Sequence, residues 1–396
     1  MNSIDHAEIK NQLRVVLSVA GSFHFFDLAR ELESHQVLDR IYSSFPWSRL
    51  AREAVPRQKV KTWPVIHPSY MLMNRLKLPL SRATTRRIEL LNSTLFDRWV
   101  AARMPECEVF YALANNGLAS GKAAQQRGAK YICDRPCSHI RYQNNIVSEE
   151  YARWGMRQMV CHPRTIEREE AEYAQADAIV VPSEFSRRSF LSLGVPAEKV
   201  HKIPYGVNLS RFSPVSAPPE DCFEVVFVGQ VSFRKGIPYL LEAFRRFQHP
   251  RKRLRVVGPV LPEMRRFLSD HLPQNAEVLG PRPQSELSRI LSTSHVLVLT
   301  SIEEGLALVQ GQAMACGCAL ISTTNTGGSD LFTDGVEGFE VPIRSPEAIT
   351  EKLELLASAP DLLAQMRHAA LERVQSIGGW REYGMLHLAL IQKLLQ

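Results

Sequence analysis

The chain has 396 residues, of which 45% are hydrophobic and 22% charged, and its net charge is +7. This length is too great for one compact domain and this composition excludes a disordered or fibrous chain, so we predict two globular domains. The sequence has neither an apolar run of about 18 residues nor a basic leader, so we expect no transmembrane helix, no secretion and a cytoplasmic location.

The first half of the sequence alternates short apolar runs with stretches of helical spacing. The apolar runs predict strands at 13–21, 38–46, 107–115, 130–136 and 177–184. Stretches between them, such as "FFDLARELES" and "NNIVSEEYARWG", have the period of amphipathic helices. Alternating strands and helices indicate a parallel sheet covered by helices on both faces.

The excess of positive charge falls within residues 1–200, mostly at 52–90, where Lys and Arg are mixed with Trp63, Tyr70 and several Leu and Met. One interpretation is an ordinary solvated surface. The other is a face that approaches an anionic partner, either the inner face of a membrane, which the protein would join peripherally, or a phosphate-bearing acceptor. We expect no nucleic acid partner, because no recognised binding motif accompanies the charge.

The stretch 204–222 is rich in Pro and Ser and is the predicted linker. After it the alternation begins again, with strands predicted at 223–230, 254–260, 276–282, 295–301, 318–324 and 338–343. The predicted fold class is therefore α/β, with two Rossmann-like, doubly wound parallel-sheet domains that face each other across a cleft. Ligands of such sheets bind beyond the carboxyl ends of the strands, so we expect the site in that cleft.

The seven cysteines are scattered along the chain, and none belongs to a CxxC pair. This pattern favours reduced thiols that pack in the interior over metal ligands. The sequence also lacks a D-x-D pair. We therefore predict no metal site.

The stretch "VVFVGQVSFRKGIPYLLEAF", 225–244, predicts a strand that ends at Gly229, a loop, and a helix that begins near Gly236. Arg234 and Lys235 lie where the loop meets the helix. Cations beside a helix N-terminus form an anion site, because the free amides and the helix dipole add to their charge. The alternative is two solvated basic residues, since the motif is neither a Walker sequence nor a full GxGxxG.

The stretch "TSIEEGLALVQGQAMACG", 300–317, places Glu304 just beyond the end of a predicted strand. A helix is predicted from near Ala307 to Gly317, where the glycine is a suitable C-terminal cap. Because Glu304 lies on the loop and Gln312 more than a turn into the helix, both side chains are able to face one ligand.

The N-terminus of this predicted helix also has main-chain amides that are free to donate hydrogen bonds. The amides of Gly305, Leu306 and Ala307 lie where a helix has no internal acceptors, so they are candidates to meet ligand oxygens. The alternative interpretation is an acid favoured by the helix dipole, followed by a surface amide. Glu303 is interpreted as a bystander.

Four stretches in chain order carry a resemblance to a known family: "ADAIVVPSEFSRRSFLSLGVPAEKVHKIPYGVNLSRFSP", "VGQVSFRKGIPYLLEAF", "EEGLALVQGQAMACGCALISTTNTGGSDLFTDGVEGFEVP" and "GGWREYG". They are similar to motifs of the retaining GT-B glycosyltransferases of family 4, the glycosyl transferases group 1. The resemblance extends from about residue 170 to the C-terminus. It is looser before that, where "SVAGSFHFFDLARELE" and "ICDRPCSHI" fit by position.

The resemblance implies a role for each motif. Lys235, with Arg234, would hold the diphosphate of a nucleotide-sugar donor, and Glu304 would contact hydroxyls of the transferred sugar. His139 matches by position a histidine near the reacting sugar, with a satisfied loop histidine as the alternative. The implied catalytic residues are thus Glu304, Lys235 and His139. The rest of the implied donor site consists of Gly21, Ser22, Gly229, Leu279, Arg282, Gly305, Leu306, Ala307, Val309 and Gln312.

Two positions depart from the family pattern. Gln230 stands where the family often has an Arg after the strand glycine, and Gln312 stands where it usually has a Glu that binds the ribose. An amide still bonds a diol, but without the charge-assisted bond of a carboxylate, so we expect weaker or altered ribose or base recognition. The resemblance also implies that the backbone of Gly21 and Ser22 approaches the phosphates and that 279–282 borders the base.

The resemblance therefore implies a retaining, metal-independent enzyme without cofactor that moves a hexose from a UDP- or GDP-sugar to a glycan or lipid-linked acceptor, in cell-surface polysaccharide or glycolipid synthesis. It implies an acceptor-side domain at 1–203, a nucleotide-sugar-binding domain at 204–378, and a C-terminal helix at 379–396 that packs back on the first domain. Two alternatives stay open: a nucleotide-sugar epimerase or phosphorylase on the same fold, and a non-catalytic sugar-nucleotide-binding protein.

Overall fold

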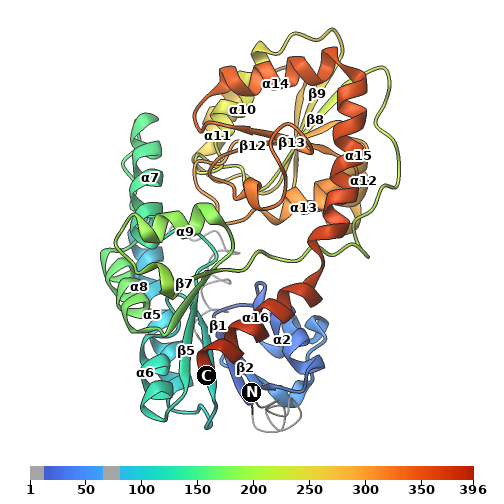
Figure 1. Cartoon of the computed structure of the whole chain (residues 1–396). Helices are drawn as coiled ribbons and strands as arrows, with labels where there is room; N and C mark the ends of the chain where they lie inside the picture. The colour runs from blue at the N-terminus through green and yellow to red at the C-terminus, as the bar shows by residue number, and fades with distance from the viewer. Residues whose placement is uncertain (1–12, 66–80) are drawn as a thin grey trace.

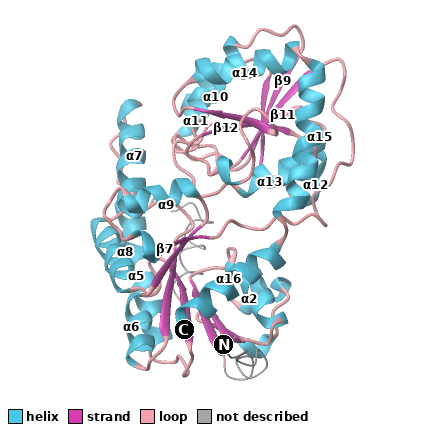
Figure 2. Cartoon of the chain, in the orientation of Figure 1, coloured by secondary structure: helices cyan, strands magenta, loops and turns pink. Residues whose placement is uncertain are grey.

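The computed structural model describes residues 13–65 and 81–396, and it consists of two α/β domains built on separate parallel sheets (Figure 1). Among these residues, β1 to β7 form the N-terminal sheet and β8 to β13 form the C-terminal sheet. Helices surround both sheets (Figure 2). The predicted fold class of two doubly wound domains is confirmed.

The N-terminal sheet is parallel, with the strand order β3-β2-β1-β4-β5-β6-β7. Its strands are β1 Val15–Val19, β2 Leu38–Ser43, β3 Val60–Thr62, β4 Val109–Leu113, β5 Lys130–Asp134, β6 Ala178–Val181 and β7 Val200–Lys202. The helices around it are α2 Phe25–Ser34, α3 Trp47–Leu50, η1 Ala51–Glu53, η2 Arg57–Lys59, α5 Arg82–Ala101, α6 Leu118–Gln126, α7 Ile140–Arg153, α8 Pro163–Gln175, α9 Glu184–Leu191 and η3 Ala197–Lys199.

The C-terminal sheet is also parallel, with the strand order β10-β9-β8-β11-β12-β13. Its strands are β8 Phe223–Val228, β9 Lys252–Val257, β10 Ala276–Gly280, β11 Val296–Leu299, β12 Ala319–Thr323 and β13 Gly338–Val341. The helices that follow β8 along the chain are α10 Ile237–Arg246, α11 Met264–His271, α12 Gln284–Ser292, α13 Leu308–Ala315, η4 Gly328–Asp330, α14 Pro346–Ser358, α15 Pro360–Ile377 and α16 Trp380–Leu395.

The apolar runs that predicted the strands lie in the interior of the domains. Every residue of β1 and of β11 is buried, as expected for parallel sheets that are covered on both faces. Two strands were not predicted, β3 with the sequence VKT and β7 with the sequence VHK. Both are edge strands of three residues, which is too short for an apolar period to be recognised.

The strand order reverses direction at one place in each sheet, between β1 and β4 and between β8 and β11. Crevices at such switch points, beyond the carboxyl ends of the strands, are where doubly wound sheets bind ligands. The loop after β1 begins near Gly21, and the loops after β8 and β11 carry Lys235 and Glu304. The topology therefore places Gly21 at the N-terminal switch point, and Lys235 and Glu304 at the C-terminal one.

The chain crosses between the domains twice, after β7 and again between α15 and α16 (Figure 1). A Cβ atom on Gly206 would lie 2.4 Å from the backbone of Gly379, so the two crossing segments touch. Beyond the second crossing, α16 packs on α2 of the N-terminal domain. A Cβ atom on Gly384 would lie 2.4 Å from that of Glu31, so a glycine permits this close approach as well.

The basic stretch at 52–90 is only partly described, because 66–80 lie outside the described residues. On the described part, Arg82 pairs with Glu263 of the C-terminal domain at 2.6 Å, and Arg86 pairs with Glu89 at 2.8 Å. Trp63 stacks on Trp99, with ring centroids 6.1 Å apart. Some of the stretch is therefore engaged within the protein. In the part of the chain that the structure describes, no helix is both long enough and apolar enough to span a bilayer.

Candidate active site

Arg234 and Lys235 lie in the loop between β8 and α10, at the C-terminal switch point. Gly236, with φ of 67°, caps α10, and a Cβ atom there would lie 1.8 Å from the carbonyl oxygen of Thr300. Glycine is required here because a side chain would force this loop away from the end of β11. The loop holds Lys235 in a buried position, with only 8% of the residue exposed.

The loop after β11 is joined to the Lys235 loop by hydrogen bonds. Thr300 Oγ1 donates to the carbonyl oxygen of Lys235 at 3.0 Å, and the amide of Ile302 donates to the carbonyl oxygen of Arg234 at 2.8 Å. These hydrogen bonds hold the two loops together, and Nζ of Lys235 forms an ion pair with the carboxylate of Glu304. The structure thus brings together Lys235 and Glu304, the two residues on which the predicted donor site depends.

Arg234 lies between two carboxylates. Its NH1 atom is 3.3 Å from Oε2 of Glu303 and 3.5 Å from Oε2 of Glu304. Burial by itself would raise the pKa of Glu304, but Lys235 and Arg234 outweigh it, so the pKa of Glu304 is lowered and the group stays ionised. The site therefore holds two fixed cations beside two carboxylates.

Glu303 is not a bystander, and that interpretation was wrong. The residue is fully buried. Its Oε1 atom accepts hydrogen bonds from the amide and the hydroxyl of Ser138, at 3.1 and 2.7 Å, and its Oε2 atom accepts one from Gln143 at 2.8 Å. Both partners belong to the N-terminal domain. They lie 165 and 160 residues away in the sequence, so no local pattern reveals them.

The N-terminus of α13 differs in one respect from the prediction that its main-chain amides are free to bind a ligand. The Ala307 amide donates to the carbonyl oxygen of Thr326 at 3.3 Å, so it is already engaged. Gly305 packs against the other domain, because a Cβ atom there would lie 1.8 Å from the carbonyl oxygen of Pro136. Leu306 is buried too. This loop is therefore an interdomain contact as well as the start of a helix.

Gln312 lies in α13 and lines a cavity of about 580 Å³ between the domains. The half-buried Val309 belongs to the same helix. Arg282, 3.6 Å from Glu286, follows Leu279 in the segment from β10 towards α12. The cavity is lined by Asp27, Arg30, Arg52, Glu53, Ala54, Gly206, Val207, Asn208, Arg211, Gln284, Leu308, Gln312 and Trp380. The cavity is therefore lined by charged side chains, and Gln312 belongs to the part of its wall that the C-terminal domain supplies.

The loop after β1 supplies backbone and one exposed aromatic side chain at the N-terminal switch point. Gly21 has φ of 137°, and its carbonyl oxygen accepts a hydrogen bond from Ser43 Oγ at 2.5 Å. Ser22 follows it, and Phe23 has φ of 44°, which is rare for a non-glycine residue, and is 62% exposed. Because the strands are parallel, this loop lies at the same sheet edge as Ser138, which touches the C-terminal domain.

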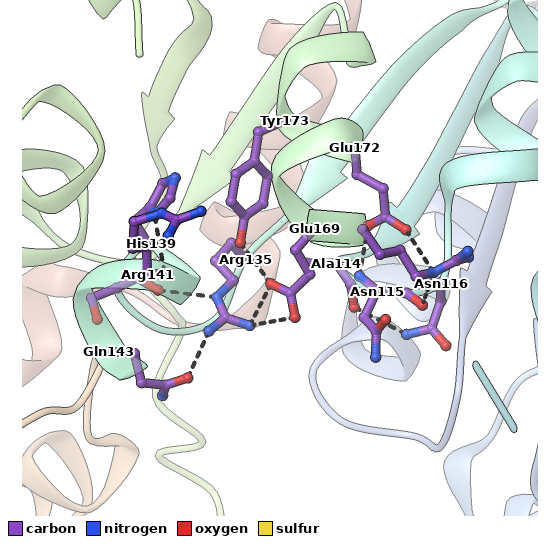
Figure 3. Close-up of polar contacts among 12 residues, drawn as sticks. Ala114, Asn115, Asn116, Arg135, His139, Arg141, Gln143, Glu169, Glu172 and Tyr173 are labelled. Carbon is purple, nitrogen blue, oxygen red and sulfur yellow. Dashed lines mark hydrogen bonds and ion pairs between the residues drawn. The ribbon is translucent and has the colours of Figure 1, made fainter. Parts of the chain in front are cut away.

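The ring of His139 is directed into the N-terminal domain, which fits the alternative of a satisfied loop histidine. Its ring packs on Tyr173 and Phe190, with centroids 5.0 and 4.9 Å away. Its Nδ1 atom accepts the amide hydrogen of Arg141 at 3.2 Å (Figure 3). Burial lowers the pKa of His139 to about 4. The side chain packs on α8 and α9 and caps α7 as a neutral ring, and its place beside a reacting sugar stays a prediction.

A buried polar chain at the N-terminal switch point does not follow from the sequence pattern. His24 Nε2 lies 3.0 Å from one Asp134 oxygen, and the hydroxyl of Tyr111 donates to the other at 3.1 Å. The same hydroxyl lies 3.1 Å from Nδ1 of His387 in α16. His24 and Asp134 occur in the two looser motifs, but only the fold brings them together with a residue of the C-terminal helix.

The described residues, 13–65 and 81–396, contain no group of three or more His, Cys, Asp or Glu side chains placed to hold a metal ion. The cysteines are free thiols. Burial raises the pKa of Cys137, beside Glu303, to about 12. This thiol is therefore protonated at neutral pH.

Two family models match the chain. Glycosyl transferases group 1 matches residues 210–373, and Glycosyltransferase Family 4 matches residues 137–211. Together they span 137–373, which is more than half of the chain. The matched segment contains the Lys235 loop, the Glu304 loop and Ser138.

Curated relatives match over part of their length. The chain is 26% identical over 217 residues to a glycosyltransferase named for colanic acid biosynthesis, WcaL of Escherichia coli (strain K12), covering 51% of this chain and 53% of that protein. It is 29% identical over 209 residues to the D-inositol 3-phosphate glycosyltransferase of Streptomyces bingchenggensis, covering 47% of this chain and 46% of that protein. The chain thus matches about half the length of these relatives.

Solved structures match over nearly the whole chain. The sucrose-phosphate synthase of Thermosynechococcus elongatus aligns with a TM-score of 0.71 and 18% identity, over 97% of this chain and 99% of that one. Anabaena Alr3699/HepE in complex with UDP-glucose aligns with a TM-score of 0.69 and 14% identity, over 96% and 100%. At these identities the likeness establishes the fold, which is the predicted GT-B fold.

Proposed function

Because the chain belongs to the group 1 glycosyltransferases, we propose that it transfers a hexose from a UDP- or GDP-sugar to a glycan or lipid-linked acceptor. The observation that carries the proposal is the Lys235–Glu304 ion pair at the C-terminal switch point. A cation there suits a diphosphate, and a carboxylate beside it suits sugar hydroxyls. Gln312, on the wall of the cavity between the domains, would then contact the ribose or base.

The proposed reaction proceeds with retention and without a metal ion. The bond between the anomeric carbon and the diphosphate breaks, and the charge that develops on the leaving group is stabilised by Lys235 and Arg234. The acceptor oxygen attacks from the same face, and its proton passes to the leaving phosphate. Lys235 would then pair with the bound diphosphate as well as with the Glu304 carboxylate. Because the sugar is attached to that diphosphate, Glu304 would lie beside the sugar.

The names of relatives support the substrate class. HepE has been solved with UDP-glucose, and a relative from Arabidopsis thaliana, 25% identical over 206 residues, is named as part of a phosphatidylinositol N-acetylglucosaminyltransferase. WcaL is named for a polysaccharide. These names favour a nucleotide-sugar donor and an acceptor that is a glycan or a lipid, in polysaccharide or glycolipid synthesis.

The test is a donor screen on the purified chain. UDP-glucose, UDP-galactose, UDP-N-acetylglucosamine and GDP-mannose are compared by thermal shift, since a ligand at 100 times its Kd stabilises the folded state by about 2.7 kcal/mol. The stabilising donor is then incubated with glycan and lipid-linked acceptors, with and without EDTA. We expect transfer that EDTA does not reduce and a product with the donor's anomeric configuration.

Other outcomes would assign the alternatives. An epimerised donor or a sugar phosphate formed without acceptor would indicate an epimerase or a phosphorylase on this fold. Donor binding without turnover for any acceptor would indicate a non-catalytic binding protein, the alternative that Gln230 and Gln312 raised. Loss of transfer in EDTA would contradict the metal-independent mechanism.

Peripheral membrane association is the part of the proposal that concerns the acceptor. Among the described residues of the basic stretch, Arg87 is exposed, whereas Arg82 and Arg86 pair with Glu263 and Glu89. Flotation with vesicles of anionic and of neutral lipid tests it. We expect salt-sensitive binding to the anionic vesicles alone, and no binding at low salt would remove the membrane from the proposal.

A further inference from the structure

Glu303 is a buried acid whose partners come from both domains. Ser138 and Gln143 of the N-terminal domain donate three hydrogen bonds to its carboxylate. From the C-terminal domain, Arg234 NH1 lies 3.3 Å from the carboxylate and also donates to the main-chain oxygen of Glu303 at 3.0 Å. One carboxylate therefore joins the other domain to a cation of the candidate active site.

A continuous polar chain extends from this carboxylate into the N-terminal domain. Gln143 donates to Glu303 through Nε2, while its Oε1 atom accepts a hydrogen bond from Arg135 at 2.8 Å. Arg135 in turn pairs with Glu169 at 2.9 Å, and Tyr173 donates to Glu169 at 2.6 Å (Figure 3). Because each member is held by the next, Gln143 has a defined orientation towards Glu303.

The residues on either side of Glu303 show why this contact matters for the site. Glu304 pairs with Lys235, and Gly305 packs against Pro136 of the N-terminal domain. Ser183, also of that domain, donates to the carbonyl oxygen of Gly305 at 2.6 Å. The loop that carries Glu304 is thus held from the opposite domain on both sides of Glu304.

We propose that Glu303 is a positioning residue that couples the closed arrangement of the two domains to the placement of Arg234 and Glu304. This inference rests on the proposed function. When the domains are together, Ser138 and Gln143 hold the Glu303 carboxylate, and the carboxylate holds Arg234 beside the diphosphate position. When they separate, Glu303 loses its N-terminal partners, and its loop and Arg234 are freed together.

The chemistry of the site calls for a carboxylate at this position. The Ser138 amide and hydroxyl, the Gln143 amide and the Arg234 guanidinium all point donors at Glu303. An ionised carboxylate only accepts, so it satisfies all of them, whereas the side-chain amide of a glutamine would direct two hydrogens at one of these donors. Glu303→Gln is therefore a nearly isosteric change that selectively breaks the coupling.

Glu263 offers a matched control. It too is a C-terminal acid held from the N-terminal domain, since its carboxylate accepts from Tyr151 at 2.9 Å and pairs with Arg82 at 2.6 Å. Its side chain is only 7% exposed. These partners belong to α7 and α5, and neither is a partner of Arg234 or Glu304. Glu263→Gln therefore removes an interdomain contact of similar kind without touching the Glu304 loop.

The experiment compares Glu303→Gln, Ser138→Ala and Glu263→Gln with the wild-type chain. UDP and GDP binding is measured by calorimetry, and kcat and KM for the donor by transfer. We expect Glu303→Gln to raise the donor KM and the Kd of the bound nucleotide about tenfold, with a smaller rise for Ser138→Ala. Glu263→Gln should leave both constants unchanged. Reduced folding alone would lower kcat at constant KM, so that result for Glu303→Gln would overturn the proposal.

Hydrogen exchange supplies a readout that needs no turnover. We expect faster exchange at the amides of 303–307 and of Ser138 in Glu303→Gln, and unchanged exchange there in Glu263→Gln. Unchanged exchange at these amides in Glu303→Gln would overturn the positioning role. If the wild-type chain binds neither UDP nor GDP and transfers no sugar, the proposed function fails, and the exchange result decides the coupling by itself.

Discussion

The two domains reverse their strand order at the same place, between the first and fourth strands, but their switch points carry different chemistry. In the C-terminal domain the loops present Lys235 and Glu304, which pair with each other across two loops. In the N-terminal domain His24 and Asp134 are buried in a chain that includes Tyr111 and His387.

This difference separates what the topology decides from what the loops decide. Topology places both switch points where a ligand between the domains would meet them. The C-terminal loops supply fixed charges that suit a diphosphate sugar, whereas the N-terminal loop supplies the backbone of Gly21 and the exposed ring of Phe23. We infer that the C-terminal edge carries the chemistry, while the buried N-terminal chain holds α16 in place.

The largest expected effect is loss of the charges at the C-terminal switch point. Lys235→Ala and Glu304→Ala should each lower kcat/KM by about 10²–10³-fold, because one preorganised charge contact contributes about 2.7–4 kcal/mol to stabilising the transition state. Transfer kinetics with the donor found in the screen measure this. Lys252→Ala is the control, since this lysine lies in the same domain and donates to the Phe244 carbonyl oxygen at 2.7 Å, away from the site. Full activity of Lys235→Ala would refute the site.

The next effect compares the buried His139 of the N-terminal domain with the half-buried His295 of the C-terminal domain. Burial lowers the pKa of His139 and of His295 to about 4, whereas an unfolded histidine titrates near 6.5. Between these pH values the unfolded chain binds more protons than the folded chain. The contribution of each neutral histidine to the free energy of unfolding is therefore fully present above pH ~6.5. It falls by about 1.4 kcal/mol per pH unit as the pH drops towards ~4.

Substitution by asparagine separates the two domains in this test. His139→Asn and His295→Asn remove the titrating ring, and each keeps an acceptor for the amide that the histidine holds, that of Arg141 or Glu224. Denaturant unfolding from pH 7 to 4.5 should show a shallower decline in stability for each variant. An unchanged slope in either variant would mean that its histidine does not stay neutral in the folded domain.

The smallest effect concerns Gln312 on the wall of the cavity. Gln312→Glu should tighten nucleotide binding about tenfold, because a carboxylate makes charge-assisted bonds to a ribose diol that an amide does not make. Calorimetry with UDP and GDP measures it, and Gln284→Glu on the same cavity is the control. Equal affinities for Gln312→Glu and wild type would place the ribose away from this residue.

Much of the fold was predictable because the strands of covered parallel sheets are apolar along their whole length. "HVLVLTS" predicted β11, and the position of Glu304 just beyond it followed from the direction of the strand. The edge strands β3 and β7 were not predictable, since three residues with a charge among them show no period. Their formation depends on a neighbouring strand that the fold supplies.

Within the site, the motifs predicted which loops matter but not the direction of each side chain. Glu303 and Glu304 are neighbours in the sequence, yet one meets Ser138 of the other domain and the other meets Lys235. His139 fits its motif by position, yet Tyr173 and Phe190 turn its ring towards α8 and α9. Neither outcome follows from residues close in the sequence.

By itself the sequence determined the alternation of strands and helices, the domain type, and the loops that carry Arg234, Lys235 and Glu304, because these depend on local periods and on strand direction. Only the tertiary structure decided that Glu303 is held by the N-terminal domain and that His139 caps a helix. Successive residues in a loop point in different directions, so the partner of each is chosen by packing between elements that are distant in the sequence, by 165 residues for Glu303 and Ser138.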